Sequence, residues 1–362
     1  MSKFTTEDIL ALQKQVMQNM QKSIQSLHDD LWGNPTEIQP PEGFPAIPTL
    51  EELESKPRSQ SPVSTANAKP AEQVKPKEEQ PKENIEDLKK ELQEYIGLAV
   101  VKDEVQDLIN LVTVQNMRKE HGLKVSDLSL HMVFSGNPGT GKTMIARLMA
   151  RIYRSLGILS RGHLVEVDRS GLVAGFVGQT AIKTQDVLQK AMGGVLFIDE
   201  AYALSNKQGN DFGQEAIDTI LKAMEDHRDN LIVIVAGYTE LMQDFIQSNP
   251  GLQSRFNRFL EFADYTASEL IDIFRMRCEK SAYVLAEDAT NLLKEILEYE
   301  QKNNENFGNA RGVRNLFEKT VVEQANRLAQ SESITKEALM CIQKEDLALA
   351  ADAYKKGILK GE

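Results

Sequence analysis

The chain has 362 residues, which is enough for more than one domain and for at least one full hydrophobic core. Lys and Arg total 42 and Asp and Glu total 54, so the net charge is −12. This balance argues against nucleic acid as the main partner, because non-specific affinity for phosphates comes from basic side chains. Its two cysteines exclude a disulfide framework, and no apolar run reaches the ~18 residues that a membrane span needs. Because no signal-peptide pattern begins the chain, we expect a protein of the reducing cytoplasm.

The first predicted element is an amphipathic helix over residues 6–32. Its apolar side chains recur at spacings of three and four, as one face of a helix requires. They are Ile9, Leu12, Val16, Met20, Ile24, Leu27 and Leu31. The polar face is mixed and not rich in Lys and Arg, which favours a coiled-coil or docking helix over a helix on a membrane surface. We assign residues 1–34 to this N-terminal helix.

A proline-rich segment follows this helix. Ten of the chain's twelve prolines lie between residues 35 and 81. Such a segment cannot bury enough apolar surface to offset its chain entropy, and its prolines favour an extended chain. Residues 35–84 are therefore predicted to form a flexible linker.

From residue 85 the sequence alternates between strand and helix patterns. Short runs rich in Val, Ile and Phe are typical of buried parallel strands. They lie at 131–135, 163–167, 195–198, 231–236 and 259–262. Helical segments separate these runs, which predicts a doubly wound α/β domain over residues 85–264. After Tyr265 the strand patterns end, so residues 265–362 are predicted to form a small all-helical domain.

A complete P-loop follows the first predicted strand. Its residues are Gly136, Asn137, Pro138, Gly139, Thr140, Gly141, Lys142 and Thr143. The glycines allow backbone N–H groups to face phosphates, and the helix that follows adds the positive end of its dipole. We expect Lys142 to reach the β- and γ-phosphates of ATP and Thr143 to hold Mg²⁺ through its hydroxyl.

Two carboxylates, Asp199 and Glu200, end the predicted strand at 195–198. Ligands of open α/β sheets bind beyond the carboxyl ends of the strands. Asp199 is therefore predicted to complete the Mg²⁺ site, and Glu200 to activate the attacking water as a general base. The alternative is a strand that merely ends in solvated acids, and the P-loop upstream makes it the weaker interpretation.

Three further polar positions are candidates for the same chemistry. Thr239 follows the strand at 231–236 and is predicted to hold the water against the γ-phosphate. Arg255 precedes the last strand and is predicted to reach a neighbouring subunit's γ-phosphate as an arginine finger, with Arg258 as a weaker candidate. Arg311 begins a helix of the helical domain and is predicted to contact phosphate. The alternative is ordinary loop polarity for Thr239 and a solvated helix residue for Arg311. For Arg255 it is a surface arginine paired with an acid, a pairing worth little.

An aromatic residue between glycines follows the second predicted strand. Phe176 lies between Gly175 and Gly178, and it has no evident part in binding phosphate. We predict that Phe176, Val177 and Gly178 form a loop that grips a polypeptide by apolar contact. The alternative is a loop residue tucked under its own domain.

Together these motifs resemble the AAA+ superfamily, and within it the CbxX/CfqX family, which includes red-type Rubisco activases and stage V sporulation protein K. The resemblance covers roughly residues 85–349. It rests on GNPGTGKT at 136–143, GFVGQTA at 175–181, VLFIDEAYAL at 195–204, FGQEAIDTILKAME at 212–225, VAGYTE at 235–240, NPGLQSRF at 249–256 and NARGVRN at 309–315. It implies a P-loop AAA+ sheet domain followed by a helical lid, ATP and Mg²⁺ as ligands, and a homo-hexamer with its active site between subunits.

The same resemblance implies roles for individual residues. By similarity, Lys142 and Thr143 are the Walker A pair, and Asp199 and Glu200 are the Walker B pair. Thr239 corresponds to sensor 1, Arg255 to the arginine finger and Arg311 to sensor 2. Phe176–Val177–Gly178 correspond to the central pore loop, and Ile96 and Gly97 to part of the adenine pocket. The pore aromatic is Phe where Tyr is common in the family. The N-terminal helix and linker resemble nothing in it, so activation of Rubisco is not carried over.

The expected function is that of an ATP-hydrolysing ring motor that remodels a protein client. A nucleotide-dependent assembly scaffold on the same fold is the main alternative. A nucleic-acid motor would need a basic groove or a DNA-reading helix, and the sequence shows neither.

Overall fold

The computed structural model describes residues 82–125, 128–176, 178–205, 212–304, 307–331 and 334–360, with side chains as far as Asp352. The predicted N-terminal helix, the predicted linker up to residue 81, and Val177 lie outside these ranges. Contacts divide the chain into two units, Met1–Lys75 and Pro76–Glu362, and all of the described residues belong to the second unit. In these ranges no helix combines the length and the apolar character that crossing a bilayer requires.

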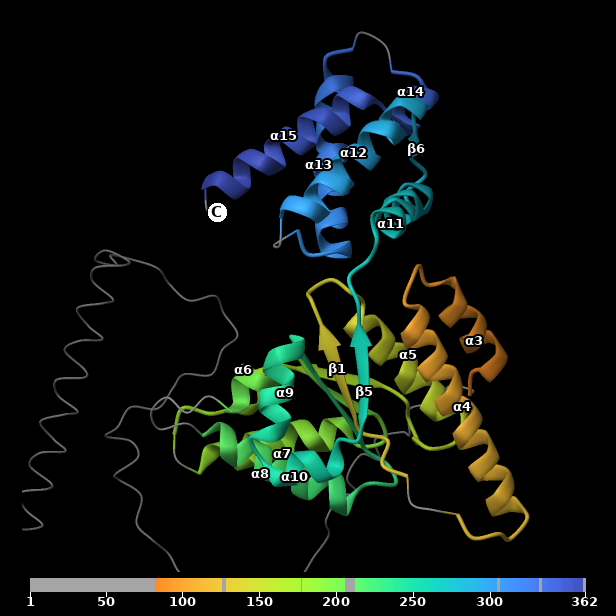
Figure 1. The fold of residues 1–362 in the computed structure, drawn as a ribbon, viewed down its shortest axis with the longest axis vertical. Helices are drawn as coiled ribbons and strands as arrows, with labels where there is room; N and C mark the ends of the chain where they lie inside the picture. The colour runs from red at the N-terminus through yellow and green to blue at the C-terminus, as the bar shows by residue number, and fades with distance from the viewer. Residues whose placement is uncertain are drawn as a thin grey trace, which may run out of the picture. The chain divides into compact units, whose positions relative to one another are not determined.

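A parallel five-stranded sheet forms the centre of the α/β domain, in the order β2-β3-β4-β1-β5 (Figure 1). The strands are β1 (Met132–Gly136), β2 (Leu164–Val167), β3 (Val195–Ile198), β4 (Ile232–Gly237) and β5 (Arg258–Phe262). Each agrees with its predicted run to within one residue at either end, which confirms the doubly wound sheet. Every residue of β1, β3 and β4 is buried, as expected for strands covered on both faces.

Helices cover both faces of this sheet. Successive side chains along each strand point to opposite sides, so the strands present apolar side chains to a core on each face. Phe134 and Phe197 pack in one core with α3 (Ile85–Glu94), α4 (Ala99–Glu120) and α5 (Lys142–Ser155). Val133 and Leu196 pack in the other core, with the helices that follow β2. Those elements are α6 (Arg169–Leu172), α7 (Gln179–Ala191), η1 (Ala201–Ser205), α8 (Gly213–Asp226), α9 (Thr239–Gln247) and α10 (Pro250–Arg255).

Two residues assigned from the sequence to the linker are attached to the α/β domain. Arg151 of α5 pairs with the carboxylates of both Glu83 and Glu91. The hydroxyl of Ser155 donates to the carbonyl of Glu83 at 2.9 Å. The side chain of Asn84 caps α3 by accepting from the backbone N–H of Glu86 at 3.0 Å. The folded surface therefore includes residues 83 and 84.

The helical domain begins with a capping box in which Thr266 and Glu269 satisfy each other's backbone N–H groups. Its helices are α11 (Ala267–Lys280), α12 (Glu287–Asn303), α13 (Ala310–Ala329), α14 (Lys336–Met340) and α15 (Lys344–Lys360). One apolar core joins them and includes Phe274, Leu297 and Leu316. The domain is helical as predicted, with one addition: β6 (Val284–Leu285) and β7 (Cys341–Ile342) form a two-stranded parallel ladder. Strands of two residues are too short to show a periodicity in sequence.

Candidate functional site

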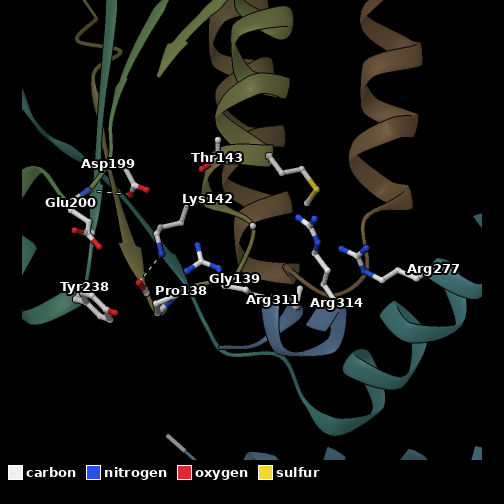
Figure 2. Close-up of a pocket in the computed structure, with 15 residues that line it drawn as sticks. Pro138, Gly139, Lys142, Thr143, Asp199, Glu200, Tyr238, Arg277, Arg311 and Arg314 are labelled. Atoms are coloured by element: carbon white, nitrogen blue, oxygen red, sulfur yellow. Dashed lines mark hydrogen bonds between the residues drawn. The ribbon is translucent and has the colours of Figure 1, made fainter. Parts of the chain in front are cut away.

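A cavity of about 390 Å³ lies at the carboxyl edge of the sheet. Figure 2 shows Lys142, Asp199 and Glu200 of the α/β domain facing it, together with Arg277, Arg311 and Arg314 of the helical domain. The cavity therefore brings together most of the predicted P-loop, both predicted Walker B carboxylates and the predicted sensor arginine, which lie far apart in the sequence.

The P-loop passes so close to its neighbours that two positions require glycine. A Cβ at Gly136 would lie 2.3 Å from the carbonyl oxygen of Phe262, and one at Gly139 would lie 2.2 Å from that of Gly308. Both glycines also have positive φ, at 145° and 75°, a region that disfavours side chains. The loop then enters α5 at Lys142, so the helix N-terminus opens onto the cavity, where it attracts anions.

Lys142 lies at the centre of the loop. Its ammonium donates to the carbonyl oxygens of Gly136 and Asn137, both at 2.8 Å. Burial lowers the pKa of Lys142, and the nearby carboxylate of Asp199 partly opposes that shift. The hydroxyl of Thr143 and the carboxylate of Asp199 also line the cavity. Both are hard oxygen ligands, which Mg²⁺ prefers, so the donors present fit the predicted metal.

Glu200 has an unusual backbone conformation. Its φ is 48°, in the left-handed region that few residues other than glycine adopt. Its N–H donates to the carboxylate of Asp199 at 3.1 Å, and both carboxylates face the same cavity (Figure 2). Strain of this kind costs ~1–3 kcal/mol and gathers at functional sites.

The end of β4 differs from the prediction. Gly237 and Tyr238 line the cavity. Thr239 is the first residue of α9 and lines a separate groove with Phe259. Thr239 therefore does not line the candidate site, because the chain has already turned into α9 at that residue. Tyr238 is the polar residue in that place, and the sequence analysis missed it.

Three arginines reach the cavity from the helical domain (Figure 2). Arg311 in the first turn of α13 was predicted, whereas Arg314 and Arg277 were not. Arg314 follows Arg311 by three residues, so helical spacing offered a signal for it. Arg277 belongs to α11, and nothing in the sequence links it to the P-loop.

A set of hydrogen bonds joins the P-loop to the start of α13. Asn309, with φ 53°, accepts from the N–H of Tyr265 at 3.0 Å and donates to Asp264 at 2.8 Å. Asn137 of the P-loop donates to both oxygens of the same carboxylate, at 3.0 and 2.9 Å. The backbone N–H of Ala310 also donates to the carbonyl of Gly139, at 3.2 Å. The helix that carries Arg311 is thus bonded directly to the phosphate-binding loop.

Arg255 lies at the end of α10, and it does not line the cavity. Its guanidinium pairs with Glu225 at 3.3 Å. The hydroxyl of Ser129 donates to the backbone carbonyl of Arg255 at 2.7 Å. Arg258 of β5 donates from Nε to the carbonyl of Ser129 at 3.2 Å, so it too is used in the structure of its own domain.

The predicted aromatic loop is exposed. Phe176 retains 72% of its accessible surface, which contradicts the alternative of a residue tucked under its own domain. Gly178 has a φ of 76° and precedes α7. Apart from the chain neighbours, no atom of the residues that the structure describes lies within 4 Å of a Cβ placed at Gly175 or Gly178. Val177 is outside the described residues.

The predicted adenine-contacting residues lie beside the helical domain. Ile96 packs against the core of the helical domain. Gly97, with φ 65°, passes so close to Glu269 that a Cβ would lie 2.5 Å from its carboxylate. Neither residue lines the cavity itself. Leu98, which follows them, comes within 3.7 Å of the Cβ position at Gly141.

Comparison with known proteins agrees with this architecture. Residues 132–264 match the profile of the ATPase family associated with various cellular activities (AAA), and residues 266–357 match that of the AAA lid domain. A crystal structure of the FIGL-1 AAA domain in complex with ADP covers 72% of this chain and 82% of its own, at 19% identity and a TM-score of 0.52. That likeness concerns the fold alone.

Sequence relatives are more similar. Stage V sporulation protein K of Bacillus subtilis is 40% identical over 271 residues, which are 74% of this chain and 84% of the relative. Protein CbbX of Cereibacter sphaeroides is 42% identical over 76% of this chain and 89% of its own length. The chloroplastic ribulose bisphosphate carboxylase/oxygenase activase of Cyanidioschyzon merolae is 43% identical over 75% and 92%.

Proposed function

Since the chain belongs to the AAA ATPase family, in the branch that contains CbbX and stage V sporulation protein K, we propose that it binds ATP in the cavity of Figure 2 and hydrolyses it. The observation that carries this proposal is the composition of that cavity. A helix N-terminus, Lys142 and Arg311 supply positive charge, and Asp199 and Glu200 supply two carboxylates beside it.

Each group has a distinct part in this proposal. Lys142 and the P-loop N–H groups bind the β- and γ-phosphates, while Arg311 neutralises charge from the helical domain. Mg²⁺, held by Thr143 and Asp199, would neutralise further phosphate charge. Glu200 accepts a proton from the attacking water, because its carboxylate is held at the edge of the cavity by the left-handed backbone.

The test is the exchange of one carboxylate for its amide. We expect Glu200→Gln to bind ATP with unchanged affinity while turnover falls by ~10² or more, the scale of losing a general base. Glu240→Gln is the matched control, because Glu240 is an exposed acid of α9 outside the cavity. ATPase rates and ATP affinity are measured on the same samples. Turnover near the wild-type rate in Glu200→Gln would reject the assignment.

We also propose that Arg255 serves the active site of an adjacent subunit in a homo-hexameric ring. Its position outside its own cavity supports this role. Arg255→Ala and Lys142→Ala are each expected to hydrolyse ATP poorly. Mixed rings of the two variants are expected to recover part of the rate, because some sites then combine an intact P-loop with an intact finger. Native mass spectrometry would establish mixing, and mixed rings without recovery would contradict a shared site.

For the work that hydrolysis drives, we propose remodelling of a protein client gripped by the loop of Phe176. Its 72% exposure supports the proposal, since such a ring contributes ~1.5–3 kcal/mol only when a partner buries it. Phe176→Ala is expected to keep basal ATPase activity and lose client remodelling, and Phe176→Tyr to keep both. A client remodelled by Phe176→Ala at the wild-type rate would favour a nucleotide-dependent scaffold instead.

A further inference from the structure

Arg277 and Arg314 bring two like charges to one cavity from different helices. Arg277 comes from the last turn of α11, and Arg314 comes from α13. Figure 2 shows the two guanidinium groups as neighbours. Burial lowers the pKa of Arg277, and the positive charge of Arg314 lowers it further. The two side chains therefore repel each other where they face the cavity.

Among the described residues, Arg314 has a carboxylate partner, whereas Arg277 has less negative charge to compensate it. Arg314 donates from Nε to Glu318 at 2.7 Å, and both partners of that pair are largely exposed. For Arg277, the attraction of Glu318 is weaker than the burial and the charge of Arg314 that lower its pKa. The Nε atom of Arg277 is buried, and no hydrogen-bond acceptor for it is found within the described ranges. A buried donor without an acceptor costs ~1–3 kcal/mol, so this arrangement is suited to an anion entering the cavity.

Their place in the cavity separates these arginines from Arg311. In Figure 2 the guanidinium of Arg311 points toward Lys142, whereas those of Arg277 and Arg314 lie on the far side of the P-loop from Asp199 and Glu200. The electrostatic influence of Arg311 on Lys142 is consistent with this placement. Asp199 and Glu200 mark the end of the cavity where the terminal phosphate reacts. The opposite end is left for the nucleoside and the phosphate attached to it.

We propose that Arg277 and Arg314 bind the α-phosphate, and so recognise a nucleotide whatever the length of its phosphate chain. This inference rests on the proposed function and assigns two binding residues to its site. Arginine suits the task, because its fork of donors can bind two phosphate oxygens at once. Arg311 would then respond to the terminal phosphates, while Arg277 and Arg314 hold the helical domain on ATP and ADP alike.

The experiment compares the affinities of ATP, ADP and AMP in full-length protein at one ionic strength, by competition with a fluorescent ADP analogue. We expect Arg277→Ala and Arg314→Ala each to weaken all three nucleotides by a similar factor of roughly ten, the scale of one charge-assisted hydrogen bond. Arg311→Ala should weaken ATP more than AMP. Arg275→Ala is the matched control, because Arg275 lies on the same helix, is half exposed and pairs with Asp272 outside the cavity.

Two further results decide the interpretation. Arg277→Lys keeps the charge without the fork and should recover part of the lost affinity. Since Arg314 is exposed, Arg314→Ala tests the inference even if Arg277→Ala fails to fold. Affinities for ADP and AMP within twofold of wild type in Arg314→Ala, or a loss confined to ATP, would overturn it. Wild-type protein that binds none of the three nucleotides would instead refute the proposed function.

Discussion

At the scale of single residues, His131 links the start of β1 to the segment that carries Arg255. Its ring is 5% exposed, and its Nδ1 accepts from the N–H of Val233 at 3.0 Å. The ring also packs edge-on against Phe256, with centroids 6.2 Å apart. Burial lowers the pKa of His131 to about 4, the charge of Arg255 lowers it further, and a hydrogen bond with the backbone of Met224 opposes the shift. The folded protein therefore holds this imidazole neutral.

A neutral buried histidine predicts a loss of stability in acid. Above the usual pKa of ~6.5 both states carry a neutral ring. As the pH falls below ~6.5 the unfolded chain binds a proton that the folded protein does not accept until about pH 4, so the free energy of unfolding falls across this window. Between pH 7.5 and 5 the contribution is ~2 kcal/mol.

Urea denaturation at these two pH values measures this contribution. His131→Asn keeps an acceptor for Val233 and should lose ~2 kcal/mol less on acidification than wild type. His121→Asn, at an exposed position, should behave as wild type does. Equal acid sensitivity in wild type and His131→Asn would show that His131 is not the group responsible.

At the scale of elements, the junction between the P-loop and α13 depends on Asn309. Its side chain joins Tyr265 to Asp264, and Asn137 of the P-loop shares that carboxylate. Because the backbone of Asn309 is in a positive-φ conformation, a glycine at 309 keeps the turn while removing the side-chain bonds. An alanine adds backbone strain to the same loss.

Asn309→Gly is therefore expected to raise the KM for ATP several-fold and to lower stability by ~1–2 kcal/mol, the scale of one or two hydrogen bonds. Asn309→Ala should be less stable again by ~1 kcal/mol. ATPase kinetics and urea denaturation measure the two effects. Asn326→Ala on the exposed face of the same helix is the control. A KM unchanged in Asn309→Gly would mean that the bonds to Asp264 do not connect α13 to nucleotide binding.

At the scale of the whole molecule, the contacts of Glu83 and Asn84 attach the first described residues to the α/β domain. A chain that begins at residue 82 keeps the pair between Glu83 and Arg151 and the cap of α3. A chain that begins at residue 85 loses both. The pair is partly exposed, so it contributes at most ~1 kcal/mol, and the cap contributes ~1 kcal/mol.

Deletion of residues 1–81 is therefore expected to leave ATPase activity within a few-fold of the full chain. Deletion of residues 1–84 should lower the free energy of unfolding by a further ~1–2 kcal/mol. Thermal and urea denaturation of the two truncated chains compare them directly. Equal stabilities would mean that the surface formed by Glu83 and Asn84 contributes nothing. If recognition of a client is also lost in the shorter deletion, the predicted N-terminal helix and linker contain its binding determinants.

The sequence by itself determined the features that depend on neighbouring residues. The P-loop from Gly136 to Thr143 is a contiguous motif, and Asp199 ends a run of apolar residues that only a buried strand explains. Local periodicity therefore located the five strands, and the motifs located the phosphate-binding loop and the carboxylates. The two-residue strands β6 and β7 were not predicted, because they are paired by the packing of the helical domain and not by a pattern of their own.

Only the tertiary structure decided which separated residues meet. Tyr238 lines the cavity while Thr239, the next residue, begins α9 and lines a separate groove, and the sequence carries no signal for where the chain turns. Arg277 reaches the same cavity from α11, more than a hundred residues after the P-loop. The physical reason is that the packing of helices brings such groups together through contacts distant in sequence, and spacing along the chain carries no record of them.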